Sequence, residues 1–153
     1  MTTLKIGDKA PSFSITDQDG KIISNETISG QKVVLFFYPK DATPGCTAEA
    51  CDLRDNYDKF LALGYSIYGI SPDSEKKHQK FIAKYDFPFS LLADEDKTML
   101  KAFGVWGPKK FMGKSYVGVL RTTFIIDEYG IITAIIDKVK TKVHANQLFD
   151  IIE

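Results

Sequence analysis

Residues 33–38 read Val33-Val34-Leu35-Phe36-Phe37-Tyr38, a continuous run of β-branched and aromatic side chains. A run of this length without a polar interruption predicts a strand that is buried on both faces of a sheet. Pro39 ends the strand, because proline has no N–H to give to a sheet. From Thr43 to Leu63 the apolar residues recur at helical spacing, which predicts one long helix. The stretch therefore predicts a strand, a short loop and a helix in succession.

The same alternation of strands and helices continues along the chain. Further strands are predicted at Ser12–Thr16, Lys21–Ile23, Tyr65–Ile70, Phe89–Ala93, Tyr116–Asp127 and Ile131–Lys138. Further helices are predicted at Asp73–Lys84, Glu95–Phe103 and His144–Ile152, and residues 104–114 are expected to form a loop. This order predicts an α/β fold in which helices flank a central mixed sheet. Most of its strands are expected to be parallel, and the late hairpin adds antiparallel pairing.

Composition narrows the class of protein. The chain has 153 residues, of which 44% are hydrophobic and 26% charged, a balance typical of one globular domain over residues 1–153. Lys+Arg 20 against Asp+Glu 20 leaves no basic excess to favour nucleic acid or a membrane surface. The amino terminus has no apolar secretory segment, and the longest uncharged stretch, residues 60–72, is too short to span a bilayer. We therefore expect a cytoplasmic protein, with its two cysteines in a reducing compartment.

Cys46 is predicted to lie in the first turn of the helix that follows the buried strand. Thr43 has the residue type of an N-cap, and Pro44 suits the first helical position. Unpaired amides and the positive end of the helix dipole favour a thiolate at such a site. The alternative is that Cys46 is a small buried residue of the core with no reactivity.

Arg121 is one of only two arginines and lies in an otherwise apolar segment, residues 117–126. Burying a guanidinium is costly unless an anion pairs with it. Glu49 could be a purely structural partner. In the functional interpretation, Arg121 faces the carboxyl ends of the strands and stabilises both the Cys46 thiolate and a polar substrate oxygen.

Cys51 follows Cys46 by five residues on the same predicted helix. This spacing separates the two Cα atoms by roughly 8–9 Å, whereas a disulfide requires Cα atoms within about 7 Å. A static structural disulfide is therefore disfavoured. Two hypotheses remain: the thiols are unrelated, or they form a reversible bond that unwinds the start of the helix.

Other candidate sites are weaker. A metal site would need ligands besides the two cysteines, and His78 and His144 show no ligand spacing. Both histidines are expected on the surface of helices. Trp106 and Phe111 could cover the Cys46 site, but anchoring in the core or in the loop is favoured.

The motif Pro39-Xaa-Xaa-Xaa-Thr43-Xaa-Xaa-Cys46 resembles the active-site signature of the peroxiredoxins, and Gly45-Cys46-Thr47-Xaa-Glu49-Xaa-Cys51 resembles their bacterioferritin-comigratory, Q-type branch. The similarity extends over nearly the whole chain, from residues 7–13 through 69–73 to 121–127. The resemblance implies a thioredoxin-like fold and thiol-dependent reduction of hydrogen peroxide and organic hydroperoxides, without metal or haem.

The resemblance also implies a role for each residue of the motif. Cys46 would be the peroxidatic cysteine and Cys51 the resolving cysteine, which forms an intrachain disulfide that thioredoxin reduces. Thr43 and Arg121 would hydrogen-bond the thiolate and the peroxide. Pro39 would shield the site, Glu49 would orient Arg121, and the Q-type branch suggests a monomer.

Three other functions remain to be separated from this one by experiment. A thiol–disulfide oxidoreductase is disfavoured by the four residues between the cysteines. A redox-sensing module would change only its binding surface on oxidation. A peroxide-inactivated holdase could coexist with the enzyme.

Overall fold

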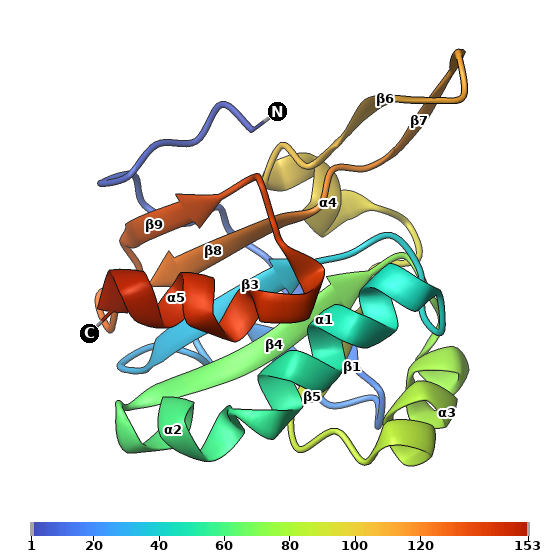
Figure 1. Cartoon of the computed structure of the whole chain (residues 1–153). Helices are drawn as coiled ribbons and strands as arrows, with labels where there is room; N and C mark the ends of the chain where they lie inside the picture. Colours follow the sequence, from blue (N-terminus) through green and yellow to red (C-terminus); the bar gives the residue numbers. More distant parts are fainter. Residues whose placement is uncertain (1, 153) are drawn as a thin grey trace.

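A computed structural model describes residues 2–152 and contains a seven-stranded sheet in the order β2-β1-β5-β4-β3-β8-β9 (Figure 1). Its strands are β1 (Ser14–Asp17), β2 (Ile22–Ser24), β3 (Lys32–Phe37), β4 (Tyr65–Ser71), β5 (Ser90–Ala93), β8 (Thr122–Ile126) and β9 (Ile132–Ile136). A separate two-stranded sheet contains β6 (Trp106–Phe111) and β7 (Lys114–Val119). The helices are α1 (Pro44–Asp55), α2 (Tyr57–Ala62), α3 (Glu75–Tyr85), α4 (Thr98–Ala102) and α5 (His144–Ile152), with a 3₁₀ turn, η1 (Thr141–Val143), before α5.

Strand β3 divides the core into two clusters, as its sequence predicts. Val33, Leu35 and Phe37 point to one face, where they pack with α4 and the amino-terminal segment. Val34 and Phe36 point to the other face, where α1, α2, α3 and α5 contribute side chains to the second cluster. Figure 1 shows α1, α2 and α5 lying across this face of the sheet. Side chains alternate because a strand has a period of two residues.

The expectation of a mostly parallel sheet is wrong. Only β3–β4 and β4–β5 are parallel, whereas the β1–β2, β1–β5, β3–β8 and β8–β9 pairs are antiparallel. The parallel pairs are the ones whose connection contains a helix long enough to cross a face of the sheet. Short turns join β1 to β2 and β8 to β9, and such turns permit only antiparallel pairing.

The helix expected over residues 43–63 is two helices that meet at Asn56. The backbone of Asn56 leaves the helical region (φ −111°, ψ 10°), and the Asn56 side-chain Nδ2 donates a hydrogen bond to the Asp52 carbonyl 2.8 Å away. An asparagine that bonds the backbone in this way competes with the helical ladder. The break leaves α1 as a separate helix that carries both cysteines.

The loop expected at residues 104–114 is instead half of a hairpin, and the strand expected at residues 116–127 is divided into β7 and β8. Phe111 pairs with Lys114 across a two-residue turn, in which Met112 (φ 52°) and Gly113 (φ 79°) both have positive φ. Turns of this kind match the twist of a hairpin, although methionine is an unusual residue for the first position. Trp106 packs against the core, but Phe111 is 66% exposed on the protruding hairpin, so its expected anchoring is wrong (Figure 1).

The other elements agree with the prediction to within about three residues at each end. Among residues 2–152, no helix has the length and apolar character needed to cross a membrane.

Gly69 lies in β4, where the sheet is most tightly packed. A Cβ atom added there would lie 2.7 Å from both Leu91 Cδ2 and Phe36 Cζ. We expect Gly69→Ala to lower the free energy of unfolding by about 1–3 kcal/mol, measured by urea denaturation. Gly107→Ala, whose Cβ would be 3.4 Å from Leu120 Cδ1, is the control. Equal denaturation midpoints for the two variants would contradict this account of the packing.

Candidate active site

The sheet register brings the start of α1 and Arg121 together. Phe37, at the end of β3, pairs with Thr122, the first residue of the antiparallel strand β8. Arg121 immediately precedes Thr122, and the loop after β3 leads into α1. Two segments separated by about 75 residues of sequence therefore meet at the carboxyl end of β3.

Arg121 contacts both Cys46 and Glu49. Its Nη2 lies 3.3 Å from Cys46 Sγ, and its Nη1 donates a 2.6 Å hydrogen bond to Glu49 Oε1. Cys46 and Glu49 are fully buried, while 22% of the Arg121 side chain is exposed. A Cβ atom on Gly45 would lie 3.4 Å from Arg121 Nη2, so the start of α1 packs directly against the guanidinium. The anions beside it raise the pKa of Arg121 despite the opposing effect of burial, so it remains a cation.

Thr43 and Pro39 lie in the loop that leads into α1. Thr43 occupies the N-cap position with extended backbone (φ −79°, ψ 154°), but its side chain makes no capping bond. Its Oγ1 donates instead to the Lys40 carbonyl, 2.8 Å away. Pro39 is half-buried directly after Tyr38. The structure thus places both residues near the helix start and gives neither a hydrogen bond to Cys46.

Cys51 lies on α1 with Cys46, and both thiols are free. Its side chain is half-buried and packs against the second core cluster. Burial raises the pKa of the Cys51 thiol, and Arg54 partly opposes this effect. Because α1 is continuous from Pro44 to Asp55, the two sulfur atoms cannot bond without a change in this helix.

His144 is buried at the start of α5, so its expected surface position is wrong. Its Nε2 lies 2.7 Å from Thr123 Oγ1 and 3.5 Å from Glu49 Oε2, and its Nδ1 lies 2.8 Å from Gln147 Oε1. Burial lowers the pKa of His144 to about 4. Burial also raises the pKa of Glu49 to about 7, although Arg121 acts in the opposite direction. No pattern in the sequence connects His144 to Glu49, because their proximity arises from the packing of α5 on α1.

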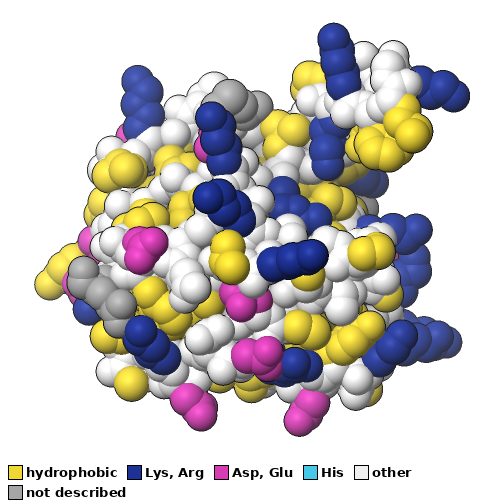
Figure 2. Space-filling view, in the orientation of Figure 1, with side chains coloured by type: hydrophobic (Ala, Val, Ile, Leu, Met, Phe, Trp, Pro, Cys, Tyr) yellow, Lys and Arg dark blue, Asp and Glu magenta, His cyan; other side chains and the backbone are white. Residues whose placement is uncertain are grey.

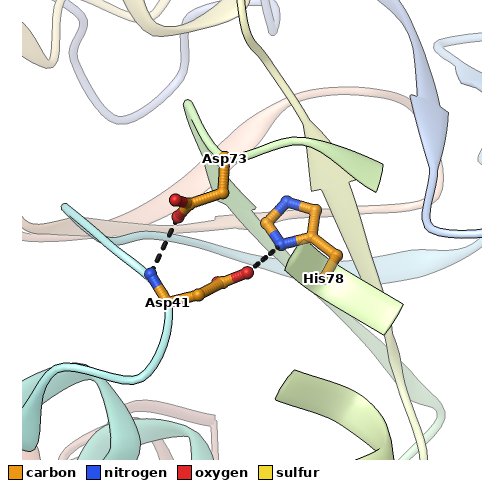
Figure 3. Close-up of side chains that lie close together, drawn as sticks. All are labelled: Asp41, Asp73 and His78. Atoms are coloured by element: carbon orange, nitrogen blue, oxygen red, sulfur yellow. Dashed lines mark hydrogen bonds and ion pairs between the residues drawn. The ribbon is translucent and has the colours of Figure 1, made fainter. Parts of the chain in front are cut away.

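His78 is also buried, against expectation, in a cluster with Asp41 and Asp73 whose potential metal-ligand atoms lie within 4.8 Å of one another (Figure 3). These atoms already have protein partners. His78 Nδ1 is 2.6 Å from Asp41 Oδ2, and Asp73 Oδ2 accepts hydrogen bonds from the Asp41 amide and the Ser71 hydroxyl. We interpret the cluster as a structural hydrogen-bond network that connects the loop before Cys46 with the end of β4 and the start of α3, rather than as a metal site.

An open depression of about 490 Å³ lies beside Arg121. It is lined by Lys109, Leu120, Arg121, Thr122, Asp137, Lys138 and Val139. Lys109 extends from the hairpin, and both burial and the nearby Arg121 lower its pKa. Figure 2 shows lysine and arginine side chains on the hairpin and along the right-hand edge of the molecule beneath it. Cys46 is not part of the lining, so Arg121 stands between the depression and the sulfur.

A buried cysteine at a helix start, with an arginine donor directed at its sulfur, is an arrangement suited to nucleophilic thiol chemistry. Residues 6–135 match the model of the AhpC/TSA family. The chain belongs to the AhpC/TSA family. Its curated relatives include peroxiredoxin Bcp of Escherichia coli K12, which is 47% identical over 144 residues covering 94% of this chain and 92% of the relative. Peroxiredoxin Bcp of Bacillus subtilis is 46% identical over 142 residues, covering 93% and 90% of the two chains.

Solved structures of peroxiredoxins have the same fold. Peroxiredoxin Q of Xanthomonas campestris superimposes with a TM-score of 0.88 at 32% identity, covering 99% of this chain and 96% of the other. Peroxidoxin BcpB of Mycobacterium tuberculosis gives a TM-score of 0.85 at 35% identity, covering 97% and 96%. A further Xanthomonas structure is described as a bacterioferritin comigratory protein with alkyl peroxide reduction activity. The predicted resemblance and the thioredoxin-like fold are confirmed, and this peroxiredoxin is a thiol peroxidase that reduces peroxides with electrons from a thiol reductant.

The raised pKa of Glu49 predicts a pH-dependent difference between the protein and its Glu49→Gln variant. An acid whose pKa rises from 4.5 to about 7 on folding stabilises the native state below pH 4.5 and loses this contribution as the pH approaches 7. Relative to the unchanged protein, the free energy of unfolding of Glu49→Gln should therefore rise by roughly 3 kcal/mol between pH 4.5 and 7. Above pH 7 this difference should stay constant.

Urea unfolding at half-unit pH intervals measures this difference. Glu26→Gln, at an exposed position, controls for the loss of one negative charge. A stability difference that stays constant from pH 4.5 to 7 would show that the Glu49 carboxyl ionises normally in the folded protein.

Proposed function

We propose that Cys46 is the peroxidatic cysteine of this peroxiredoxin and that Cys51 resolves it. The observation that carries the proposal is the 3.3 Å contact between Arg121 Nη2 and the buried Cys46 sulfur at the start of α1. A positive donor and the helix dipole both favour the thiolate over the thiol. The same donor can stabilise the charge that develops on a peroxide oxygen as the O–O bond breaks.

The first step is a displacement at oxygen. The Cys46 thiolate attacks the terminal oxygen of a hydroperoxide, an S–O bond forms and the O–O bond breaks. The departing alkoxide takes a proton and leaves as an alcohol, or as water when the substrate is hydrogen peroxide. Cys46 has then been oxidised by two electrons to the sulfenic acid.

The second step requires α1 to unwind. The Cys51 sulfur attacks the Cys46 sulfenic acid, water leaves and an intrachain disulfide forms. Because Cα atoms five residues apart on a helix are roughly 8–9 Å from each other, the first turns of α1 must open before the sulfur atoms meet. Opening separates Cys46 and Glu49 from Arg121, so the enzyme cannot attack a second peroxide until the disulfide is reduced.

The remaining site residues act on the first step. Glu49 holds the guanidinium of Arg121 in place through the 2.6 Å hydrogen bond from Arg121 Nη1 to Glu49 Oε1. Thr43 and Pro39 belong to the loop that leads into the first turn of α1. In this proposal the Thr43 hydroxyl rotates away from the Lys40 carbonyl and hydrogen-bonds a bound peroxide. Pro39 shields the thiolate from water. The depression beside Arg121 is the route by which peroxide reaches the sulfur.

The physiological context is part of the same proposal. The disulfide lies in an unwound, surface segment that a dithiol protein can reach, and we assign this role to thioredoxin. We also propose that residues 1–153 act as one domain, as a monomer and in the cytoplasm. Both hydrogen peroxide and organic hydroperoxides are substrates, and the alkyl peroxide reduction described for the Xanthomonas relative supports the organic class.

Two cysteine variants separate the steps. We expect Cys46→Ser to lose peroxide consumption entirely, because no other residue supplies the nucleophile. Cys51→Ser should form the sulfenic acid at the rate of the unchanged protein and then stop, since thioredoxin has no disulfide to reduce. Stopped-flow mixing with hydrogen peroxide and with cumene hydroperoxide, followed by coupled thioredoxin turnover, measures both steps.

The same series tests the alternative functions. Peroxide consumption by Cys46→Ser would refute the assignment of the nucleophile. Reduction of protein disulfides without peroxide consumption would instead indicate a thiol–disulfide oxidoreductase. Oxidation of both cysteines without turnover in the presence of reductant would indicate a redox sensor.

A further inference from the structure

Glu49, which contacts Arg121, belongs to a group of three buried polar side chains. Glu49, Thr123 and His144 come from α1, β8 and α5, and each is at most 1% exposed. Glu49 uses Oε1 to bind Arg121, but Oε2 is buried without a hydrogen-bond partner. The nearest basic atom is His144 Nε2, 3.5 Å away. A buried oxygen without a partner is costly in free energy.

The hydrogen bonds around His144 fix its tautomer. Gln147 Oε1 accepts a hydrogen bond from the Lys140 amide, and Gln147 Nε2 donates to the Lys138 carbonyl, so the orientation of this side-chain amide is determined. His144 Nδ1 also faces Gln147 Oε1, at 2.8 Å, and must therefore carry a proton. In the neutral ring Nε2 is then an acceptor with one lone pair.

Two groups compete for that lone pair. The Thr123 hydroxyl, 2.7 Å away, donates to Nε2. An ionised Glu49 would turn a negative oxygen toward the same lone pair, with no proton between them. A proton on Oε2 removes this repulsion, because the carboxyl group becomes a donor that shares the lone pair of His144 Nε2 with the Thr123 hydroxyl.

We propose that His144 is a positioning residue of the peroxidase, which accepts a hydrogen bond from protonated Glu49 and thereby holds the carboxyl group that orients Arg121 beside Cys46. The inference rests on the proposed role of Cys46, and it places a proton on Glu49 Oε2. When Glu49 is protonated, its Oε1 still accepts from Arg121, and the full charge of the guanidinium is available to the sulfur and the peroxide. When Glu49 is ionised, it neutralises part of that charge.

The electrostatics of the surrounding groups agree with this arrangement. Cys46 from α1, Lys109 from β6 and His144 from α5 are ionisable groups near the Glu49–Arg121 pair. Asp137 and Lys138, which follow β9, line the depression beside Arg121. Burial raises the pKa of Glu49 to about 7 and lowers the pKa of His144 to about 4. Between pH 4 and 7, Glu49 is therefore protonated and His144 is neutral.

The test is the pH profile of Cys46 oxidation, measured by stopped flow in the full-length protein. We expect an inflection near pH 7 that is absent in Glu49→Gln. His144→Asn keeps a donor for Gln147 but removes the acceptor from Glu49, so the inflection should move to lower pH and the rate at pH 7 should fall roughly tenfold. Thr123→Val removes the competing donor with little change in volume, so the inflection should move to higher pH.

Asp52→Ala is the matched control. Asp52 Oδ2 accepts a hydrogen bond from the Ala145 amide at 2.8 Å, so this variant loosens α5 one residue from His144 without touching Glu49. We expect its inflection to stay where it is in the unchanged protein. An equal shift in Asp52→Ala and His144→Asn would overturn the proposal, as would a Thr123→Val inflection that moves down or stays in place.

A spectroscopic measurement gives a readout independent of activity. The chain has two histidines, so ¹⁵N spectra of the imidazoles can be assigned with His144→Asn. We expect His144 at pH 6 to be neutral, with the proton on Nδ1 and none on Nε2. An imidazolium or the opposite tautomer would overturn the proposal while leaving the peroxidase assignment intact. Loss of the peroxide reaction in the unchanged protein would instead refute the proposed function.

Discussion

The contact of one arginine with a thiol and a carboxylate is the interaction on which the site depends. Arg121 lies between Cys46 and Glu49, and a buried guanidinium is stable only where its partners are held in place. The antiparallel pairing of β3 with β8 delivers the arginine to the end of β3, where α1 begins. The start of α1 packs against the Arg121 guanidinium at Gly45. The fold thus places a fixed cation next to the sulfur before any peroxide arrives, which is the preorganisation that catalysis of charge transfer requires.

Helix α1 must satisfy two conflicting requirements. It must be folded to put Cys46 at its positive end and to direct Glu49 at Arg121. In the proposed mechanism it must also open for Cys51 to reach Cys46. Leu53 in the core and the hydrogen bond from the Ala145 amide to Asp52 hold the carboxyl side of the helix. Toward its start, Cys46 and Glu49 contact Arg121, and η1 packs against the helix. In the proposed mechanism, formation of the Cys46–Cys51 disulfide removes the contacts of Cys46 and Glu49 with Arg121, so disulfide formation and opening of the first turn are coupled.

Those features of the site that depend on the local sequence pattern could be predicted from the sequence. The apolar run at residues 33–38 predicts a buried strand, and Thr43 and Pro44 predict the helix start that contains Cys46. The position of Arg121 in an apolar segment predicts an anionic partner, for which Glu49 was a candidate. The positions of His78 and His144 could not be predicted, because each is buried by contacts between elements distant in sequence. The turn at Met112 and the break at Asn56 were missed because the first uses an unusual residue and the second depends on a side-chain bond to the backbone.

Amide hydrogen exchange of α1 in the reduced and the peroxide-oxidised protein tests the central claim most directly. If formation of the Cys46–Cys51 disulfide opens the start of the helix, amides from residues 47–51 should lose protection on oxidation, while those of β3 and β8 keep theirs. Cys51→Ser treated with the same peroxide should retain its protection. A disulfide-bonded protein whose α1 amides exchange as slowly as those of the reduced form would contradict the account.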